Sequence, residues 1–113
     1  MERLDFLRPL EDITLNEVGL EAVFECEISK DGLQADWLKD GKTIKASENV
    51  LITSKGCIHR LVVSSSKSED EGQYTVIFKT PEGKSSAQLL IKGKNAFRFE
   101  NKNIEVYNYS YLL

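Results

Sequence analysis

Short stretches in which apolar and polar residues alternate constrain this chain more than any other feature. In AVFECEI, residues 22–28, every second position is apolar and the positions between them are mostly charged. Successive strand residues point to opposite faces of a sheet, so a period of two is typical of half-buried antiparallel strands. The same alternation predicts inward side chains at Ala22, Phe24, Cys26, Ile28, Trp37, Leu61, Val63, Tyr74, Val76, Phe78, Ala87, Leu89 and Ile91, and outward ones at Arg60 and Val62.

Turn residues separate these stretches roughly every 8–12 positions. Two Asp-Gly pairs, Asp31–Gly32 and Asp40–Gly41, and the loop TPEGK at 80–84 predict tight turns. Pro9 interrupts the first strand, and only SKSEDEG, at 66–72, fits a single helical turn, which would link strands of opposite sheets. We therefore predict an all-β fold, a Greek-key sandwich of two antiparallel sheets without long helices.

The last 21 residues differ in kind, because half of the ten aromatic residues fall there together with four Asn. We place a boundary near Gly93, with a β-sandwich domain at 1–92 and a tail or linker at 93–113. The tail is expected to be irregular or to form an added strand, either on its own molecule or on a neighbouring copy. Its candidate interaction residues are Phe97, Phe99, Tyr107, Tyr109 and Tyr111.

Composition and charge exclude several classes of protein. The net charge is −3, and basic and acidic residues are interleaved, so no basic stripe for nucleic acid is present. No apolar run approaches the roughly 18 residues that a membrane span requires. Acidic residues among the first fifteen interrupt any signal-peptide core, so we expect no secretory signal.

The residues that usually carry chemistry are sparse. His59 is the only histidine and is expected to be a satisfied residue at the core boundary rather than a general base. Two cysteines 31 positions apart in the chain fit no metal-binding spacing, and Glu69–Glu71 is interpreted as an exposed acidic loop. The glycosylation pattern at Asn108–Ser110 is interpreted as a chance match. We therefore expect no enzyme activity, no cofactor and no metal.

Three motifs in order carry a family resemblance. Cys26 lies in FEC, Trp37 follows eleven residues later in WLKDGK, and the corner DEGQY contains Asp70, Gly72 and Tyr74. Over residues 4–92 the chain resembles the immunoglobulin superfamily, specifically the intermediate (I-set) domains. The phrases FECEISK, WLKDGK and SEDEGQYT resemble the domains of giant muscle proteins, the group of titin, obscurin and myosin-binding protein C.

The resemblance implies roles for the core residues. Trp37 would pack on Cys26. The Tyr74 hydroxyl would form a hydrogen bond with the loop backbone, and Gly72 would allow the turn. Asp70 would pair with a basic side chain such as Arg60. Val76 occupies the position at which extracellular members carry the second cysteine, so no disulfide is expected and a reducing compartment is implied. A Cys26–Cys57 bridge is the competing interpretation, disfavoured because Cys57 is expected to be out of phase with Leu61. Cys57 remains a possible redox-sensitive thiol, although a partly buried thiol without a role is preferred.

The resemblance also implies a function. We expect a cytoplasmic structural and protein-binding module of a cytoskeletal, sarcomeric protein, contacting neighbouring immunoglobulin or fibronectin domains or cytoskeletal proteins. Terminal strands at about 12–18 and 86–91 would pair in parallel and resist shear. Two alternatives stay open: an extracellular adhesion or receptor domain that lacks the bridge, and a docking domain attached to a muscle or cytoskeletal kinase.

Overall fold

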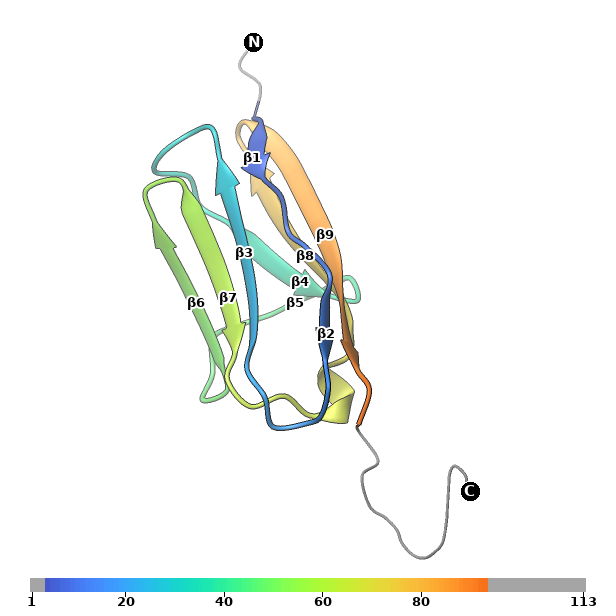
Figure 1. Cartoon of the computed structure of the whole chain (residues 1–113). Coiled ribbons are helices and arrows are strands. Elements are labelled where there is room, and N and C mark those ends of the chain that lie inside the picture. Colours follow the sequence, from blue (N-terminus) through green and yellow to red (C-terminus); the bar gives the residue numbers. More distant parts are fainter. Residues whose placement is uncertain (1–3, 94–113) are drawn as a thin grey trace, which may run out of the picture.

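Two β-sheets packed face to face form the molecule in the computed structural model, which describes residues 4–93 (Figure 1). The four-stranded sheet, sheet A, contains in spatial order β1 (Phe6–Arg8), β3 (Ala22–Ile28), β7 (Ile58–Val63) and β6 (Val50–Lys55). The five-stranded sheet, sheet B, contains in spatial order β2 (Ile13–Leu15), β9 (Glu82–Ile91), β8 (Gly72–Lys79), β4 (Asp36–Lys39) and β5 (Lys42–Thr43). The predicted all-β sandwich is confirmed.

The connections follow the turn chemistry of the sequence. Asp40 and Gly41 both have positive φ, of 51° and 83°, and form the two-residue turn between β4 and β5. A single 3₁₀ turn, η1 (Ser68–Asp70), links β7 of sheet A to β8 of sheet B, as the SKSEDEG stretch predicts. Neighbouring strands are antiparallel with one exception among the described residues, the parallel pair β2 and β9.

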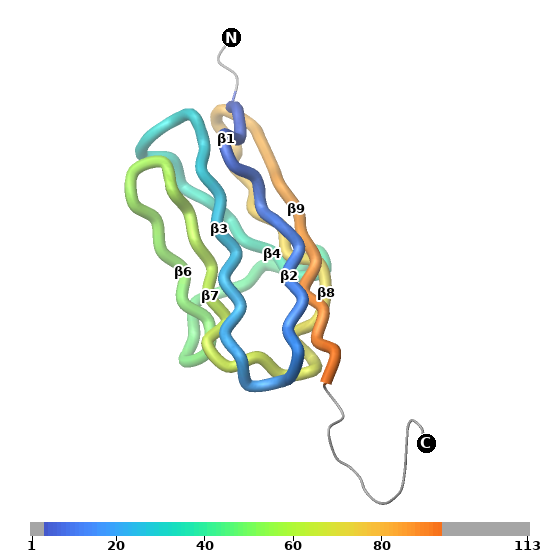
Figure 2. Tube along the Cα trace, viewed as in Figure 1, coloured from blue at the N-terminus to red at the C-terminus, as the bar shows by residue number. Residues whose placement is uncertain are grey.

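The first strand of the chain is divided between the two sheets. β1 pairs with β3 in sheet A, and after Pro9 the chain crosses to sheet B, where β2 pairs with β9 (Figure 2). Pro9 lacks an N–H group and cannot donate to a ladder, so a break at this position is expected. The crossing leaves β2 and β3 on either side of a seam between the sheets.

The core lies between the sheets and contains the alternating residues of every long strand. Phe24 and Tyr74 stack across it with ring centroids 4.7 Å apart, and the Phe6 and Phe78 rings lie 6.0 Å apart. Because these side chains come from both sheets, their burial holds the sheets together. The inward positions predicted from the sequence are all buried, and Leu4, Leu10 and His59 join them.

Val62 faces outward as expected, yet it is only 8% exposed, because it lies on the central strand β7 between its neighbours Val23 and Leu51. Two expectations about other single residues are wrong. His59 is 1% exposed, and its Nε2 has no hydrogen-bond partner among the described residues. Its ring instead packs edge-on against Phe78, with centroids 4.9 Å apart.

The expected phase of Cys57 is also wrong. Its backbone carbonyl accepts the N–H of Ile28 at 2.9 Å, so it continues the ladder of β7 with its side chain packed against the core. It therefore shares the phase of Leu61, and phase is no argument against a bridge to Cys26. Both cysteines are nevertheless unbridged in the structure.

Residues 4–93 contain neither a membrane-spanning helix nor a cluster of potential metal ligands. No helix in that range is long and apolar enough to cross a membrane. No group of three or more His, Cys, Asp or Glu side chains is placed there to hold a metal ion.

Candidate load-bearing site at the terminal strands

The parallel pair β2 and β9 joins the beginning of the domain to its end. Ile13 lies opposite Leu89 and Leu15 lies opposite Ile91. Beyond the strand, the N–H of Lys92 donates to the carbonyl of Leu15 at 2.9 Å. The chain leaves β2 towards the body of the domain and leaves β9 towards residue 93, so a pull on both ends would slide the two strands along each other.

Two side chains extend this pairing beyond the three residues of β2. The carboxylate Oδ1 of Asp12 accepts a hydrogen bond from the N–H of Gln88 at 2.8 Å. The hydroxyl of Ser85 accepts one from the N–H of Leu10 at 3.0 Å. The segment that crosses between the sheets is therefore attached to β9 at two further points, although it forms no strand there.

A third side chain, again a carboxylate, completes β9 at its far end. β8 begins at Gly72, opposite Leu89, so the residues of β9 after this point have no β8 backbone beside them. The Glu71 Oε2 accepts the N–H of Ile91 at 2.6 Å and takes the place of that missing strand. Charge-assisted hydrogen bonds of this kind are short and stronger than neutral ones.

The corner that precedes β8 is held by the hydroxyl of Tyr74. This hydroxyl donates to the carbonyl of Asp70 at 2.6 Å, while the ring is buried against Phe24. Burial and the nearby negative charge of Asp70 raise the pKa of Tyr74, so the phenol stays protonated and remains a donor. The expected pairing of Asp70 with Arg60 is wrong, because the Asp70 carboxylate accepts the N–H of Lys67 at 2.8 Å within η1.

Gly72 lies where another part of the chain comes close. Its φ is +148°, and a Cβ at this position would lie 2.6 Å from the Asp40 carboxylate. That carboxylate accepts the N–H of Gln73 at 3.0 Å, and the Asp40 N–H donates to the Gln73 carbonyl at 2.8 Å. The hydrogen bond that the carboxylate accepts from the Gln73 N–H is the main reason that the pKa of Asp40 is lowered. Glycine is therefore required here by both backbone conformation and space.

The buried thiol lies at the centre of the core. Cys26 and Val76 are both fully buried, and Val76 lies opposite Trp37 in the β4–β8 pairing. Burial raises the pKa of the Cys26 thiol to about 11, so it is protonated at neutral pH and behaves as a small apolar group. The Nε1 of Trp37, also buried, has no hydrogen-bond partner among the described residues.

Three strands of sheet A are joined on their outer face by one carboxylate. Glu25 on β3 accepts from Arg8 on β1 at 2.8 Å and from the Nε of Arg60 on β7 at 2.8 Å. Hydrogen bonds from Arg60 and then from Arg8 lower the pKa of Glu25. Glu25 and Arg60 are opposite each other in the β3–β7 register, which explains why Arg60 pairs with Glu25 rather than with Asp70.

Asp12, Glu71 and Glu25 are structural groups that were not predicted from the sequence. Each is an acidic residue next to or within a strand, and nothing in its local pattern names a partner many residues away. The five aromatic candidates of the tail, Phe97 to Tyr111, lie outside the described residues, so the proposed division at residue 93 stays a prediction.

The fold and this site together define a β-sandwich module of the immunoglobulin type. Residues 4–92 match the immunoglobulin I-set domain model, and the chain therefore belongs to this family. It is 37% identical over 102 residues to cardiac-type myosin-binding protein C of Mus musculus, a match that covers 88% of this chain and 7% of the relative. The chain thus spans only about 7% of the length of the curated relatives it matches.

Solved structures of muscle proteins are similar as well. Domain I10 of titin is 32% identical, with a TM-score of 0.70 over 80% of this chain and 99% of that one. Titin domains Z1Z2, solved in complex with telethonin, are 25% identical, with a TM-score of 0.75 over 85% of this chain and 51% of that one. The relatives are therefore sarcomeric muscle proteins, and immunoglobulin domains of this kind are found in complexes with protein partners.

Proposed function

We propose that this chain is a load-bearing and protein-docking module of a sarcomeric protein, located in the cytoplasm and without catalytic activity. The observation that carries the proposal is the parallel pairing of β2 with β9. Strands pulled in opposite directions along their length load all their hydrogen bonds at once, whereas strands pulled from one end open one bond at a time. In this proposal, residues 1–92 form the immunoglobulin module and residues 93–113 are a tail or linker.

The side-chain hydrogen bonds around the terminal strands support the mechanical half of the proposal. The Asp12–Gln88 and Leu10–Ser85 hydrogen bonds lie in line with the β2–β9 ladder and would be loaded with it. Glu71 attaches the end of β9 to the rest of sheet B. The docking half is supported by similarity to the titin domains that were solved together with telethonin.

Single-molecule stretching of the chain between its two ends tests the mechanical half. Leu15 turns its backbone groups towards β9, since its carbonyl accepts from Lys92, and the neighbouring residue Thr14 turns its own away. Leu15→Pro removes an N–H on the loaded side and should lower the unfolding force clearly. Thr14→Pro makes the same change on the side facing away and serves as the matched control.

Equal unfolding forces for the two proline variants, both close to that of the unmodified chain, would contradict the proposal. Chemical unfolding of both variants separates a loss of force from a general loss of stability. The change in the free energy of unfolding predicts a certain drop in unfolding force. A role for the β2–β9 pair under load is supported only if the measured drop is larger than that.

A further inference from the structure

One edge of β3 is left without a strand partner where the chain changes sheets. β1 pairs with β3 only as far as Glu27, because the chain departs at Pro9. The N–H of Ile28 donates towards β7, and backbone groups alternate along a strand. Val23 and Glu25 therefore turn their N–H and C=O groups towards the seam with β2, and no strand in the described part of the chain pairs with them there.

A groove of about 290 Å³ lies along this edge. Its lining residues before β3 are Arg8, Pro9, Glu11, Asp12 and Ile13, and Val23 and Glu25 line it from β3. The groove therefore combines unpaired backbone with two aliphatic side chains, the combination that an extended peptide recognises when it adds a strand to a sheet.

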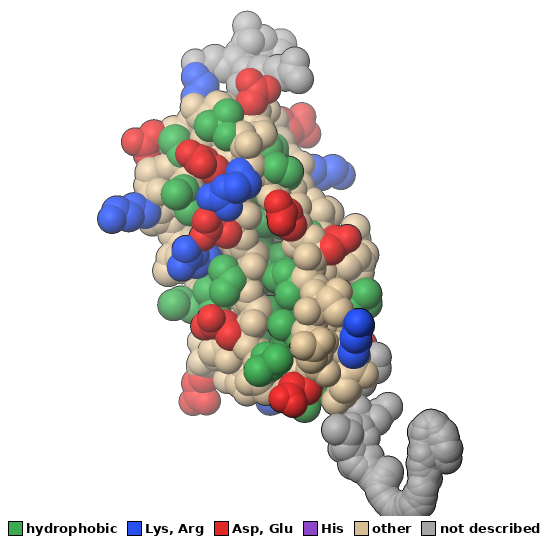
Figure 3. Space-filling model, in the orientation of Figure 1, with side chains coloured by type: hydrophobic (Ala, Val, Ile, Leu, Met, Phe, Trp, Pro, Cys, Tyr) green, Lys and Arg blue, Asp and Glu red, His purple; other side chains and the backbone are tan. Residues whose placement is uncertain are grey.

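Apolar surface continues from this groove across the outer face of sheet A. Val23 is 37% exposed and lies opposite Val62, which in turn lies opposite Leu51, 58% exposed. Figure 3 shows hydrophobic side chains through the middle of this face, with acidic and, mainly in its upper half, basic side chains around them. A strand placed beside β3 would extend this row by one further side chain.

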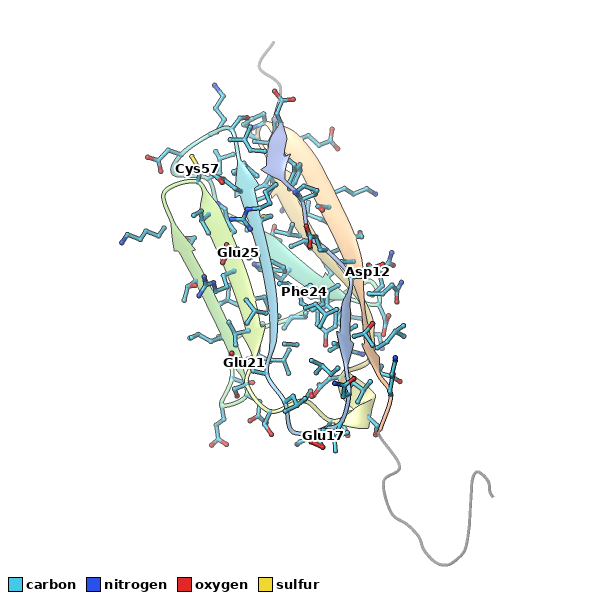
Figure 4. The ribbon with its side chains drawn as sticks, viewed as in Figure 1. Asp12, Glu17, Glu21, Phe24, Glu25 and Cys57 are labelled. Carbon is cyan, nitrogen blue, oxygen red and sulfur yellow. The ribbon has the colours of Figure 1, made fainter. Side chains whose placement is uncertain are left out.

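The charges around the seam determine whether a positively or a negatively charged partner is favoured. Figure 4 shows Asp12 on one side, Glu21 on the other and Glu17 in the turn that closes the lower end. Glu11 adds a fourth carboxylate on the groove wall. Glu25 is already engaged by two arginines, so the four remaining carboxylates give the seam a negative potential that favours a cationic partner.

We infer that this seam binds an extended basic segment of a partner protein, with alternating lysine or arginine and aliphatic residues. The segment takes the position beside β3 that β1 leaves at Pro9. Its backbone pairs with Val23 and Glu25, one aliphatic side chain enters the groove next to Ile13, and its cations face the carboxylates. This names the partner chemistry for the docking half of the proposed function and rests on it, whereas the stretching experiment tests the other half independently.

The test uses the full 113-residue chain and a capped peptide of sequence Lys-Val-Lys-Thr-Lys-Val-Lys, followed by NMR titration and amide hydrogen exchange. We expect shifts at Ile13, Val23 and Glu25 and slower exchange of the Val23 and Glu25 amides. Glu11→Lys combined with Glu21→Lys should weaken binding at least about threefold, and added salt should weaken it further. Glu48→Lys, an exposed change in the loop between β5 and β6, is the matched control and should have little effect.

Three results would overturn the inference. The first is equal binding of a peptide with Glu in place of each Lys, which would remove the role of charge. The second is a set of shifts on the edge strands β5 or β6 instead of the seam. The third is an absence of binding with Val23 and Glu25 already protected in the free chain, which would mean that the chain's own remaining residues or a second copy fill the groove.

Discussion

The Asp12 carboxylate accepts a hydrogen bond from the backbone N–H of Gln88 at 2.8 Å, across 76 residues of sequence. The contact extends the β2–β9 ladder to the residue before β2, on the segment that carries the chain from one sheet to the other. Asp12 thus performs with a side chain what a backbone carbonyl performs elsewhere in the ladder.

Asp12→Ala should remove this hydrogen bond and lower the free energy of unfolding by about 1 kcal/mol, because the Gln88 N–H loses its partner. Urea unfolding followed by tryptophan fluorescence measures the change. Glu11→Ala, one residue away and exposed, is the control and should leave stability nearly unchanged. If the two variants unfold at the same urea concentration, the Asp12 contact does not stabilise the fold.

Gly72→Ala should be strongly destabilising, since the new Cβ would lie 2.6 Å from the Asp40 carboxylate in a backbone conformation that side chains rarely adopt. We expect a loss of about 1–3 kcal/mol. Gly19→Ala is the matched control, because Gly19 also has positive φ, of +90°, but has nothing within 4 Å of a Cβ. A Gly72→Ala chain that melts with or above the Gly19→Ala chain would contradict the assigned close approach.

Trp37→Ala should lower the free energy of unfolding by roughly 3–5 kcal/mol, because a large buried side chain is lost and a cavity remains. Trp37→Phe keeps an aromatic ring in place and leaves no buried Nε1 without a partner, so its loss should be clearly smaller. Thermal unfolding by circular dichroism compares the two. Melting of the alanine variant within a few degrees of the unmodified chain would show that the core assignment is wrong.

His59 should make stability depend on pH. Burial lowers the pKa of His59 below its ordinary value of 6.5, so below that pH the unfolded chain binds more protons than the folded one. Stability is therefore highest above about pH 6.5 and decreases as the pH falls below it. Urea unfolding at pH 7.5, 6.5 and 5.5 measures this loss.

His59→Leu provides the control for this pH dependence, since it replaces the titrating imidazole ring by an aliphatic side chain. The carboxylate of Glu25, whose pKa is lowered by Arg60 and Arg8, loses its contribution only below its ordinary value of 4.5 and does not interfere. The leucine variant should show equal stability from pH 7.5 to 5.5. A loss of the same size in both chains would assign the effect to other groups.

The fold class and the inward residues of the strands could be predicted from local sequence patterns. Each strand has its own alternation of apolar and polar residues. This alternation is a local property of the sequence, so it can be recognised without knowing which strand is the partner. The turns at Asp40–Gly41 and at η1 are local as well, because φ preferences and short polar segments act over a few residues.

Which polar groups meet could not be predicted in this way, because their partners lie on distant segments of the chain. The register of β3 against β7 places Glu25 opposite Arg60, so Asp70, expected from the corner motif, is not the partner of Arg60. Likewise the neighbours Val23 and Leu51 cover Val62, which alternation alone places in solvent. Polar side chains at strand ends and on outer faces follow no period, and their partners are set by strand pairing across long stretches of sequence, which exists only once the sheets have formed.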